Sequence, residues 1–323
     1  MQAQNRISSQ KEALPIIFHP ATPEDKAAMA AMRAVVEPNK GKLRGAAARG
    51  PYDDIMNRVV APEGVSYEED EIGGIPGWWC RPEGARDGEA ICHLHGGWFN
   101  FGSAKAFRHL VGHIAKSANV AAFVPEYRLA PEHPFPAAIE DAQSAYRGLY
   151  DAGIEKIAVT GDSSGGNLVL LLLSRLQDSA EAVRVALPVG AVVLSPTTDL
   201  ALTGETWSTR AAVDPYFTKP QVEEMVTAYL GNTDPKSPAV SPLYGDFRNL
   251  PPIIIHVGND EVLLDDSSRY VERAIETGID AKLDVWERMV HGFLGGVGKM
   301  SASQQALSAI GAFLKDRFRS SQV

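Results

Sequence analysis

From about residue 60 onward, short apolar runs alternate with runs that have helical spacing, and Gly or Pro bounds most of them. The strand-like runs cover residues 90–97, 120–129, 156–162, 189–196, 251–260 and 281–288, and the helical runs cover 104–119, 135–153, 165–177, 265–278 and 301–318. Several strands are apolar at nearly every position, as expected when helices cover both faces of a sheet. The pattern therefore predicts an α/β fold with a mostly parallel central sheet.

An N-terminal region precedes this alternation. Residues 19–38 have the spacing of a helix, with Thr22 as its capping residue and Pro23 in its first turn. Residues 39–54 follow it and are rich in Gly, Lys and Arg. We expect this second stretch to be a mobile connection.

The alternation breaks again over residues 201–240, which contain an expected helix at 219–231 and no strand that would continue the sheet. We interpret this stretch as an insertion over the top of the sheet. The chain thus divides into an N-terminal helical segment, residues 1–50, a catalytic domain formed by residues 51–200 and 241–323, and the insertion.

Composition narrows the class of partner. The chain has 323 residues and a formal net charge of −9, which argues against a nucleic-acid partner because such proteins usually present a basic face. The N-terminus has no apolar signal-peptide core, and the most apolar run, "LVLLLLSRL", is too short to span a membrane. Cys80 and Cys92 belong to no CxxC pair and are expected to be buried free thiols. We expect a cytoplasmic protein without a membrane span, and a homodimer is compatible with these features.

The stretch "VTGDSSGGNL" places two adjacent serines at the end of a strand and the start of a helix. A serine on a sharp strand-to-helix turn needs small residues two positions before and after it, and Gly161 and Gly165 satisfy this only if Ser163 is central. Ser163 is therefore the candidate nucleophile, and the backbone N–H of Ser164 is a candidate oxyanion donor. A glycine-rich turn that caps a helix or binds phosphate is the alternative, but GxxxxGK[ST] and GxGxxG motifs are absent.

A second motif, "HLHGGWFNFGS", ends an earlier strand. The consecutive glycines after His95 let backbone N–H groups face a pocket, which would supply the other oxyanion donors of an acyl-transfer enzyme. His93 and His95 have HxH spacing, and His109 and His113 lie one helical turn apart. No carboxylate completes either pair, so we expect no metal and no organic cofactor.

A catalytic serine also needs a base and a group that orients the base. His256 lies inside an apolar strand and is expected to be structural, whereas His291 follows a strand on a Gly-containing loop. Asp260 and Glu261 come directly after another strand, and either is a candidate acid. The order serine, acid, histidine is typical of α/β-hydrolases.

Taken together, "HGGWFNFGS", "EYRLAPEHPFPAAIEDA", "VTGDSSGGNL", "LSPTTDL", "HVGNDEVLLDD" and "MVHGF" resemble, in the same order, the hormone-sensitive lipase-like family of α/β-hydrolase esterases. The resemblance covers most of the chain from about residue 85. It implies an α/β-hydrolase fold, a carboxylic-ester substrate, Ser163 as nucleophile and His291 as general acid–base. It also implies a helical cap built from the N-terminal helices and residues 201–240.

Position in the family pattern favours Glu261 over Asp260 as the acid. The same comparison implies Gly97, Trp98 and Ser164 as oxyanion donors, with His95 and Gly96 shaping the loop. Here the chain departs from the family, which has a third glycine where this chain has Trp98. We expect Trp98 to adopt a backbone geometry that favours glycine and to narrow the pocket.

The expected substrate is a short- to medium-chain or aromatic ester, hydrolysed through an acyl-enzyme. The candidate pocket residues are Trp98, Phe99, Asp162, Trp207, Tyr216 and Phe217. Amide, formamide or lactone hydrolysis by the same residues stays open, and "HGGW" is similar to kynurenine formamidases. A non-catalytic small-molecule receptor on the same fold is the alternative of another class, but such relatives lack the catalytic histidine, which His291 supplies here.

Overall fold

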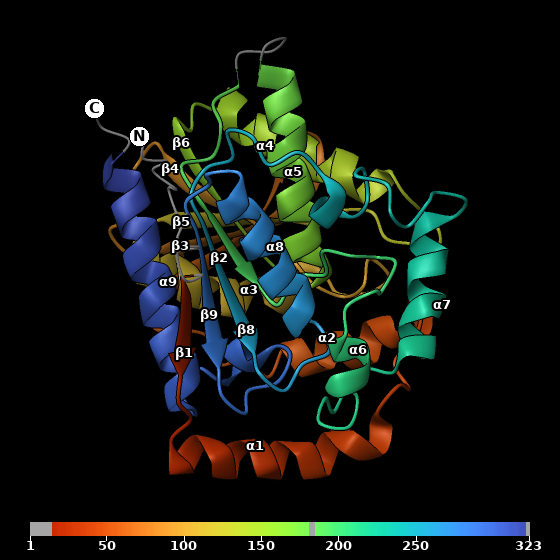
Figure 1. Ribbon diagram of the computed structural model, residues 1–323. Coiled ribbons are helices and arrows are strands. Elements are labelled where there is room, and N and C mark those ends of the chain that lie inside the picture. Colours follow the sequence, from red (N-terminus) through yellow and green to blue (C-terminus); the bar gives the residue numbers. More distant parts are fainter. Residues whose placement is uncertain (1–14, 181–184, 321–323) are drawn as a thin grey trace, which may run out of the picture.

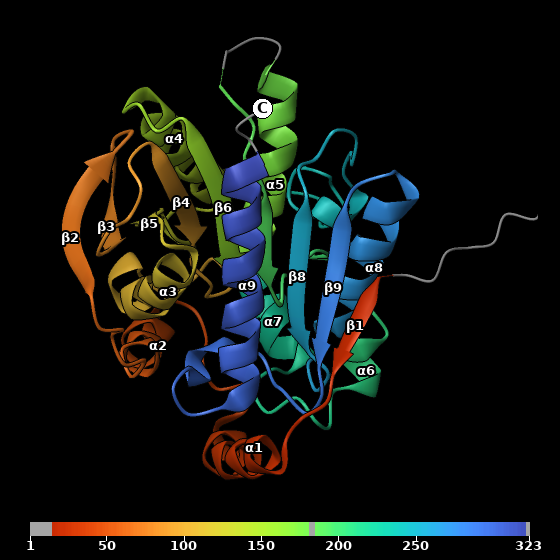
Figure 2. The same cartoon turned by 90° about the vertical axis from the view of Figure 1, so that its left-hand side faces the viewer.

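The computed structural model describes residues 15–180 and 185–320. A nine-stranded sheet runs through its centre in the order β1-β9-β8-β7-β6-β4-β5-β3-β2 (Figures 1 and 2). Its strands are β1 (Ile16–His19), β2 (Val65–Ile72), β3 (Ile75–Pro82), β4 (Glu89–Leu94), β5 (Ala121–Pro125), β6 (Lys156–Asp162), β7 (Ala191–Leu194), β8 (Ile253–Gly258) and β9 (Ala281–Trp286). All neighbours pair in parallel except β2 with β3 and β3 with β5. The predicted α/β fold with a mostly parallel sheet is confirmed.

Helices cover both faces of the sheet (Figure 2). The helices are α1 (Pro23–Val36), α2 (Arg49–Met56), α3 (Ala104–Ala118), α4 (Ala137–Asp151), α5 (Ser164–Ala180), α6 (Thr206–Thr209), α7 (Lys219–Leu230), α8 (Leu264–Glu276) and α9 (Ser301–Ser320). Buried side chains of α4, α5 and α8 form one core, and those of α3 and α9 form the other. In β6, Ile157 and Val159 enter the first core and Ala158 the second, because successive side chains of a strand point to opposite faces.

Four helices lie at the end of the sheet where the parallel strands terminate: α1, α2, α6 and α7 (Figure 1). Helix α1 begins as predicted, since Thr22 Oγ1 accepts a hydrogen bond from the N–H of Asp25 and Pro23 occupies the first turn. Helix α7 matches the expected helix of residues 219–231, and residues 201–240, all of them described, contain no strand.

The expectation of a mobile connection at residues 39–54 is wrong. The stretch contains the start of helix α2, and Arg49 at that start donates hydrogen bonds to the carbonyls of Asn100 and Ala130. Its basic side chains bind carbonyl groups of the neighbouring loops, so the composition does not mark a solvated linker. The expected boundary between the N-terminal segment and the catalytic domain, after residue 50, consequently falls inside helix α2.

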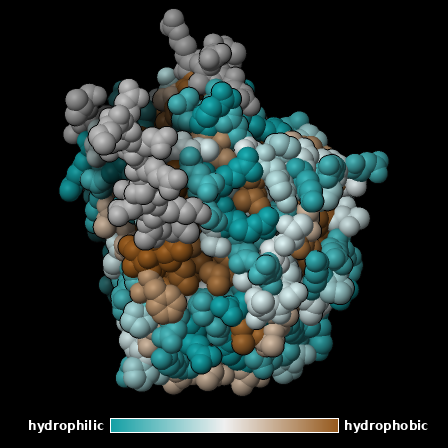
Figure 3. Space-filling model, viewed as in Figure 1, coloured by the Kyte–Doolittle hydropathy of each residue, from teal (hydrophilic) through white to brown (hydrophobic). Residues whose placement is uncertain are grey.

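The edges of the sheet were less visible in the sequence. Strand β1 pairs in parallel with β9, and its Ile16, Ile17 and Phe18 are exposed by 43%, 49% and 55%. A brown area marks the position of this strand in Figure 3. At the other edge, the hairpin of β2 and β3 turns at Gly73 and Gly74, both of which have positive φ.

Candidate active site

Five neighbouring strands end at one edge of the sheet, and each delivers part of the candidate site. Ser163 follows β6 and Glu261 follows β8, while His291 lies on the loop after β9. Strand β4, the other neighbour of β6, leads into the loop of His95, Gly96 and Gly97. Parallel pairing therefore gathers segments that are up to about 200 residues apart in the chain, as expected at the carboxyl edge of an α/β sheet.

Ser163 stands on a tight turn between β6 and α5. Its φ of 55° lies in the left-handed region, which is costly for a residue with a side chain. A Cβ on Gly161 would lie 2.6 Å from the carbonyl oxygen of Gly165, and one on Gly165 would lie 2.0 Å from that of Leu94. Gly161 thus allows β6 and α5 to approach each other, and Gly165 allows α5 to approach β4, so that Ser163 is held on the turn.

The carboxylate of Glu261 is fully buried and accepts hydrogen bonds at both oxygens. His291 Nδ1 donates to Oε2 over 3.0 Å. The N–H of Gly258 and the hydroxyl of Ser195 donate to Oε1 over 2.6 and 2.8 Å. These contacts leave Nε2 as the ring nitrogen of His291 that is available to a substrate or to a serine hydroxyl.

Asp260, the other candidate acid, takes a different partner. Its Oδ2 lies 2.8 Å from the guanidinium of Arg33, on cap helix α1. Arg33 also donates to the carbonyl of Val213 in residues 201–240. Through Arg33, Asp260 therefore links helix α1 and residues 201–240 to the end of β8, and within the described residues no hydrogen bond or ion pair joins it to His291.

Ser195 is a site residue that the sequence reasoning missed. It follows β7, the strand between those that precede Ser163 and Glu261, and its φ of 44° is again in the left-handed region. The N–H of Ser163 donates to the carbonyl of Leu194 over 2.8 Å, and the hydroxyl of Ser195 donates to Glu261, so the end of β7 connects Ser163 with Glu261. The only sequence signal was the short "LSP" after an apolar strand.

The surroundings of His291 change its pKa in opposing directions. Burial lowers the pKa, but the hydrogen bond and charge of Glu261, with smaller contributions from Asp214 and Asp162, outweigh burial and raise it above 6.5. An imidazole with a raised pKa and an anchored Nδ1 is suited to accept and return a proton at Nε2.

The loop after β4 presents backbone N–H groups beside the serine. Within the residues that the structure describes, the N–H groups of Gly97, Trp98 and Ser164 have no hydrogen-bond acceptor. A Cβ on Gly97 would lie 1.9 Å from the carbonyl oxygen of Phe101, so this position requires glycine. His95 stabilises the loop, because its Nδ1 donates to the carbonyl of Gly96 over 2.8 Å and its own carbonyl accepts from Tyr127.

Trp98 adopts the expected backbone conformation, with a φ of 51°. Its indole is 1% exposed and meets Phe217 edge-on at a centroid distance of 5.3 Å. Phe217 in turn lies 5.0 Å from the ring of His291, and Trp207 lies 6.4 Å from Trp98. These side chains form an aromatic cluster that joins the loop after β4 to residues 201–240 and to His291.

A cavity of about 410 Å³ opens beside His291, a size typical of small-molecule sites. Of the six predicted pocket residues, Asp162 and Tyr216 line it. Trp98, Trp207 and Phe217 belong to the aromatic cluster and not to the lining, and Phe99 is buried against Tyr229 of α7 at a centroid distance of 3.8 Å.

Most of the cavity wall comes from segments that the sequence analysis had not connected with the site. Helices α1 and α2 and the 3₁₀ turn η4 (Phe293–Gly296) contribute apolar side chains, together with Met300, which precedes α9. Four of these are methionines: Met29, Met32, Met56 and Met300. Methionine side chains adapt their shape easily, so the wall can accommodate groups of different outline.

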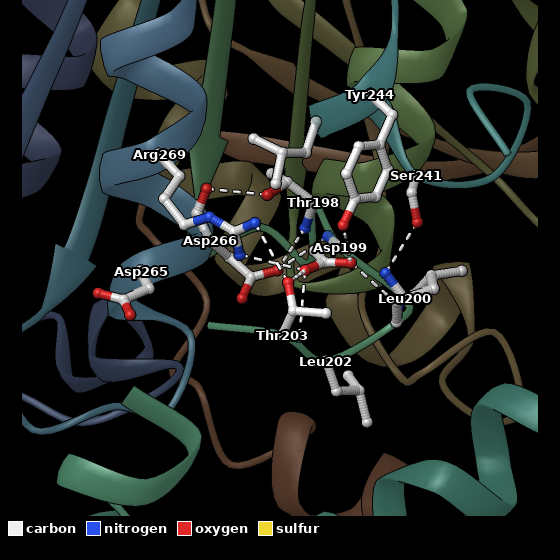
Figure 4. A network of polar contacts seen from close by, with 12 residues as sticks. Thr198, Asp199, Leu200, Leu202, Thr203, Ser241, Tyr244, Asp265, Asp266 and Arg269 are labelled. Atoms are coloured by element: carbon white, nitrogen blue, oxygen red, sulfur yellow. Dashed lines mark hydrogen bonds and ion pairs between the residues drawn. The ribbon is translucent and has the colours of Figure 1, made fainter. Parts of the chain in front are cut away.

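A second buried polar network joins the segment after β7 to helix α8 (Figure 4). Asp199 accepts hydrogen bonds from Thr203, Tyr244 and Arg269. Asp266 Oδ1 accepts from the N–H groups of Thr198 and Asp199, while its Oδ2 has no donor in the described part of the chain. Burial, aided by the charge of Asp199, raises the pKa of Asp266 to about 7.

The remaining candidate residues have structural surroundings. His256 lies inside β8 and accepts a hydrogen bond from Trp286 Nε1. Cys80 and Cys92 are buried free thiols, as predicted.

Among the described residues there is no group of three or more His, Cys, Asp or Glu side chains that could hold a metal ion. In the same part of the chain, no helix has the length and apolar character needed to cross a membrane.

Comparisons with known proteins identify the family of the chain. A family model described as the alpha/beta hydrolase fold matches residues 91–295. An acetyl-hydrolase of Streptomyces hygroscopicus is 35% identical over 246 residues, which cover 76% of this chain and 81% of the relative. An esterase of Acinetobacter venetianus is 34% identical over 228 residues, which cover 70% of this chain and 74% of the relative.

A solved structure has a similar shape over nearly the whole chain. The crystal structure of an esterase from the bacterial hormone-sensitive lipase family has a TM-score of 0.83 and 35% identity, and the match covers 92% of this chain and 98% of that one.

Proposed function

Because this chain belongs to the hormone-sensitive lipase-like esterases of the α/β-hydrolase fold and hydrolyses carboxylic esters, we propose that Ser163, His291 and Glu261 are its catalytic triad. The observation that carries the proposal is the hydrogen bond between Glu261 and His291 at the sheet edge that bears Ser163. Asp260 is not the acid in this proposal, since its carboxylate is paired with Arg33.

The reaction follows from the orientation of the imidazole. Nδ1 of His291 donates to Glu261, so Nε2 takes the proton of Ser163 as the serine oxygen attacks the ester carbonyl. His291 then returns the proton to the leaving alcohol. Water deprotonated by His291 attacks the acyl-enzyme, and the carboxylic acid leaves as Ser163 regains its proton.

Negative charge develops on the carbonyl oxygen in both halves of the reaction. We assign its stabilisation to the N–H groups of Gly97, Trp98 and Ser164, which have no acceptor within the described chain. Donors that are already fixed in place stabilise this charge without reorganisation, and each typically contributes about 10²- to 10³-fold to the rate.

The proposed substrates are esters with a short to medium acyl chain or an aromatic group. Support comes from the size of the cavity, about 410 Å³, and from its methionine-rich wall. A cytoplasmic location and a homodimer stay predictions, as does the division of the chain at residues 50, 200 and 240.

Labelling with a fluorophosphonate tests the nucleophile. The probe should modify the intact protein once, at the peptide that contains Ser163, and Ser163→Ala should abolish the modification. Labelling of Ser164, or labelling that persists in the Ser163→Ala variant, would contradict the assignment. A protein that is not labelled at all would contradict the proposed triad.

A further inference from the structure

We propose that the cavity beside His291 selects esters that carry an anionic group at the end of the molecule far from the ester bond. The inference rests on the proposed function and adds the class of substrate. It stands on the distribution of charge along the cavity and on the lack of any structural partner for the two cations at its outer end.

The cavity has a catalytic end and an outer end. Among the lining residues, Asp162, Ser195 and His291 are buried or half-buried and lie beside the proposed triad, which defines the catalytic end, and most of the others are apolar. Arg58, which follows helix α2, and Lys299, which precedes α9, also line the cavity, and their exposed side chains define its outer end. Both side chains are exposed, so a group that leaves the apolar middle of the cavity meets them at the solvent boundary.

The two cations are unusual among the basic residues of this region. Between residues 15 and 60, Lys26, Arg33, Lys40, Lys42, Arg44 and Arg49 each have an ion pair or a side-chain hydrogen bond. Across the described residues, neither the guanidinium of Arg58 nor the ammonium of Lys299 has such a partner. Their charges therefore do not fasten the cap to the sheet.

The position of the acidic lining residue predicts the orientation of the ligand in the cavity. Of the described residues that line the cavity, only Asp162 carries a carboxylate; it lies at the catalytic end and accepts a hydrogen bond from the N–H of Gly96. A second anion close to Asp162 would be repelled, whereas an anion at the outer end would meet two positive charges. This local arrangement opposes the net charge of −9 of the whole chain, which by itself would repel anionic substrates.

The test compares matched pairs of esters on the same enzyme. One pair places the charge on the acyl side, p-nitrophenyl hydrogen suberate against p-nitrophenyl octanoate, and the other places it on the alcohol side, 4-carboxybenzyl against benzyl butyrate. The measured quantity is the ratio of kcat/KM for the charged ester to that for the neutral one. Because a ratio is taken on one enzyme preparation, a fraction of misfolded variant cancels.

In the Arg58→Gln and Lys299→Gln double variant, this ratio should fall by roughly threefold to tenfold for at least one pair, as expected for two exposed ion pairs. Raising the ionic strength from about 0.02 to about 0.5 M should lower the wild-type ratio for the same pair, because exposed charges are screened. The double change to Glu should lower the ratio further.

Lys236→Gln and Arg319→Gln are matched controls. Both side chains are exposed and neither lines the cavity, and Arg319 lies at the opposite end of α9 from Lys299. They should leave both ratios unchanged. Unchanged ratios in the Arg58 and Lys299 variants, with the neutral esters still hydrolysed, would overturn the anion-binding proposal alone. If the fluorophosphonate does not label Ser163 in the wild type, the proposed function itself is wrong.

Discussion

The carboxylate of Glu261 accepts a hydrogen bond from Nδ1 of His291 over 3.0 Å, although Asp260 precedes it directly in the chain. The neighbouring carboxylate points to Arg33 of helix α1, 2.8 Å away. Two adjacent acids thus serve different parts of the molecule: one orients the imidazole and the other fastens the cap.

Glu261→Gln should lower kcat by about 10⁴-fold, because the amide cannot stabilise the imidazolium that forms during the reaction. Asp260→Asn should retain most of kcat and lower the free energy of unfolding by about 2 kcal/mol, since it breaks a partly buried ion pair. Steady-state kinetics and urea unfolding of both variants separate the two roles. The reverse pattern, with Asp260→Asn as the inactive variant, would exchange the assignments.

The rate should depend on the protonation of His291. Only the neutral imidazole can accept the serine proton, so kcat/KM should fall as the pH is lowered through a pKa that lies above 6.5. Removing the charge of Glu261 should move this midpoint to lower pH, because that charge helps to raise the pKa. A pH–rate profile whose acidic limb is the same in wild type and Glu261→Gln would show that another group titrates.

Ser195→Ala removes a donor to the buried Oε1 of Glu261 and should lower kcat about tenfold with little change in KM. The loss also leaves the carboxylate less stabilised, so the pKa of His291 should shift as well. Measuring kcat, KM and the pH profile together distinguishes this positioning role from simple destabilisation, which would lower the amount of active enzyme without moving the midpoint.

Asp266→Asn should change stability in a pH-dependent way. The folded protein raises the pKa of Asp266 from 3.8 to about 7, so it binds the proton more tightly than the unfolded chain does. The contribution of Asp266 to stability is therefore fully present at low pH and decreases as the pH rises from about 4 to about 7. Asn imitates the neutral acid at every pH.

The difference in unfolding free energy between the two proteins measures this contribution. Between pH 5 and pH 8, the unfolding free energy of the wild type should decrease by about 2 to 3 kcal/mol relative to that of the Asn variant. Urea unfolding at the two pH values provides both numbers. A difference that is independent of pH would mean that Asp266 does not change its protonation over this range.

Trp98→Gly should relieve the left-handed strain at this position and open space beside Phe217. We expect the optimum of kcat/KM in a series of p-nitrophenyl esters to move toward longer acyl chains. Loss of the buried indole should also cost about 3 to 5 kcal/mol of stability. An unchanged chain-length preference would show that Trp98 does not limit the pocket.

The interior of the fold could be predicted because buried parallel strands and covering helices have strong local patterns. The turn that holds Ser163 could be predicted for a steric reason, since Gly161 and Gly165 fix the register of the motif. Strand β1 was missed because it is four residues long, exposed, and separated by more than 260 residues from its partner β9.

Other features depend on contacts that no local pattern encodes. Ser195 follows β7, which lies between β6 and β8 in the sheet. Its hydrogen bond to Glu261 therefore depends on the order of the strands. The wall of the cavity combines α1, α2 and η4, which are distant in sequence. Residues 39–54 looked like a linker because the partners of Arg49, the carbonyls of Asn100 and Ala130, lie far along the chain.

Turnover of p-nitrophenyl butyrate by Ser163→Ala tests the nucleophile most directly. The wild type should hydrolyse this ester, and the variant should be slower by about 10⁶-fold in kcat while it unfolds at a similar urea concentration. A folded Ser163→Ala variant with activity close to that of the wild type would contradict the assignment of Ser163 as the reacting group.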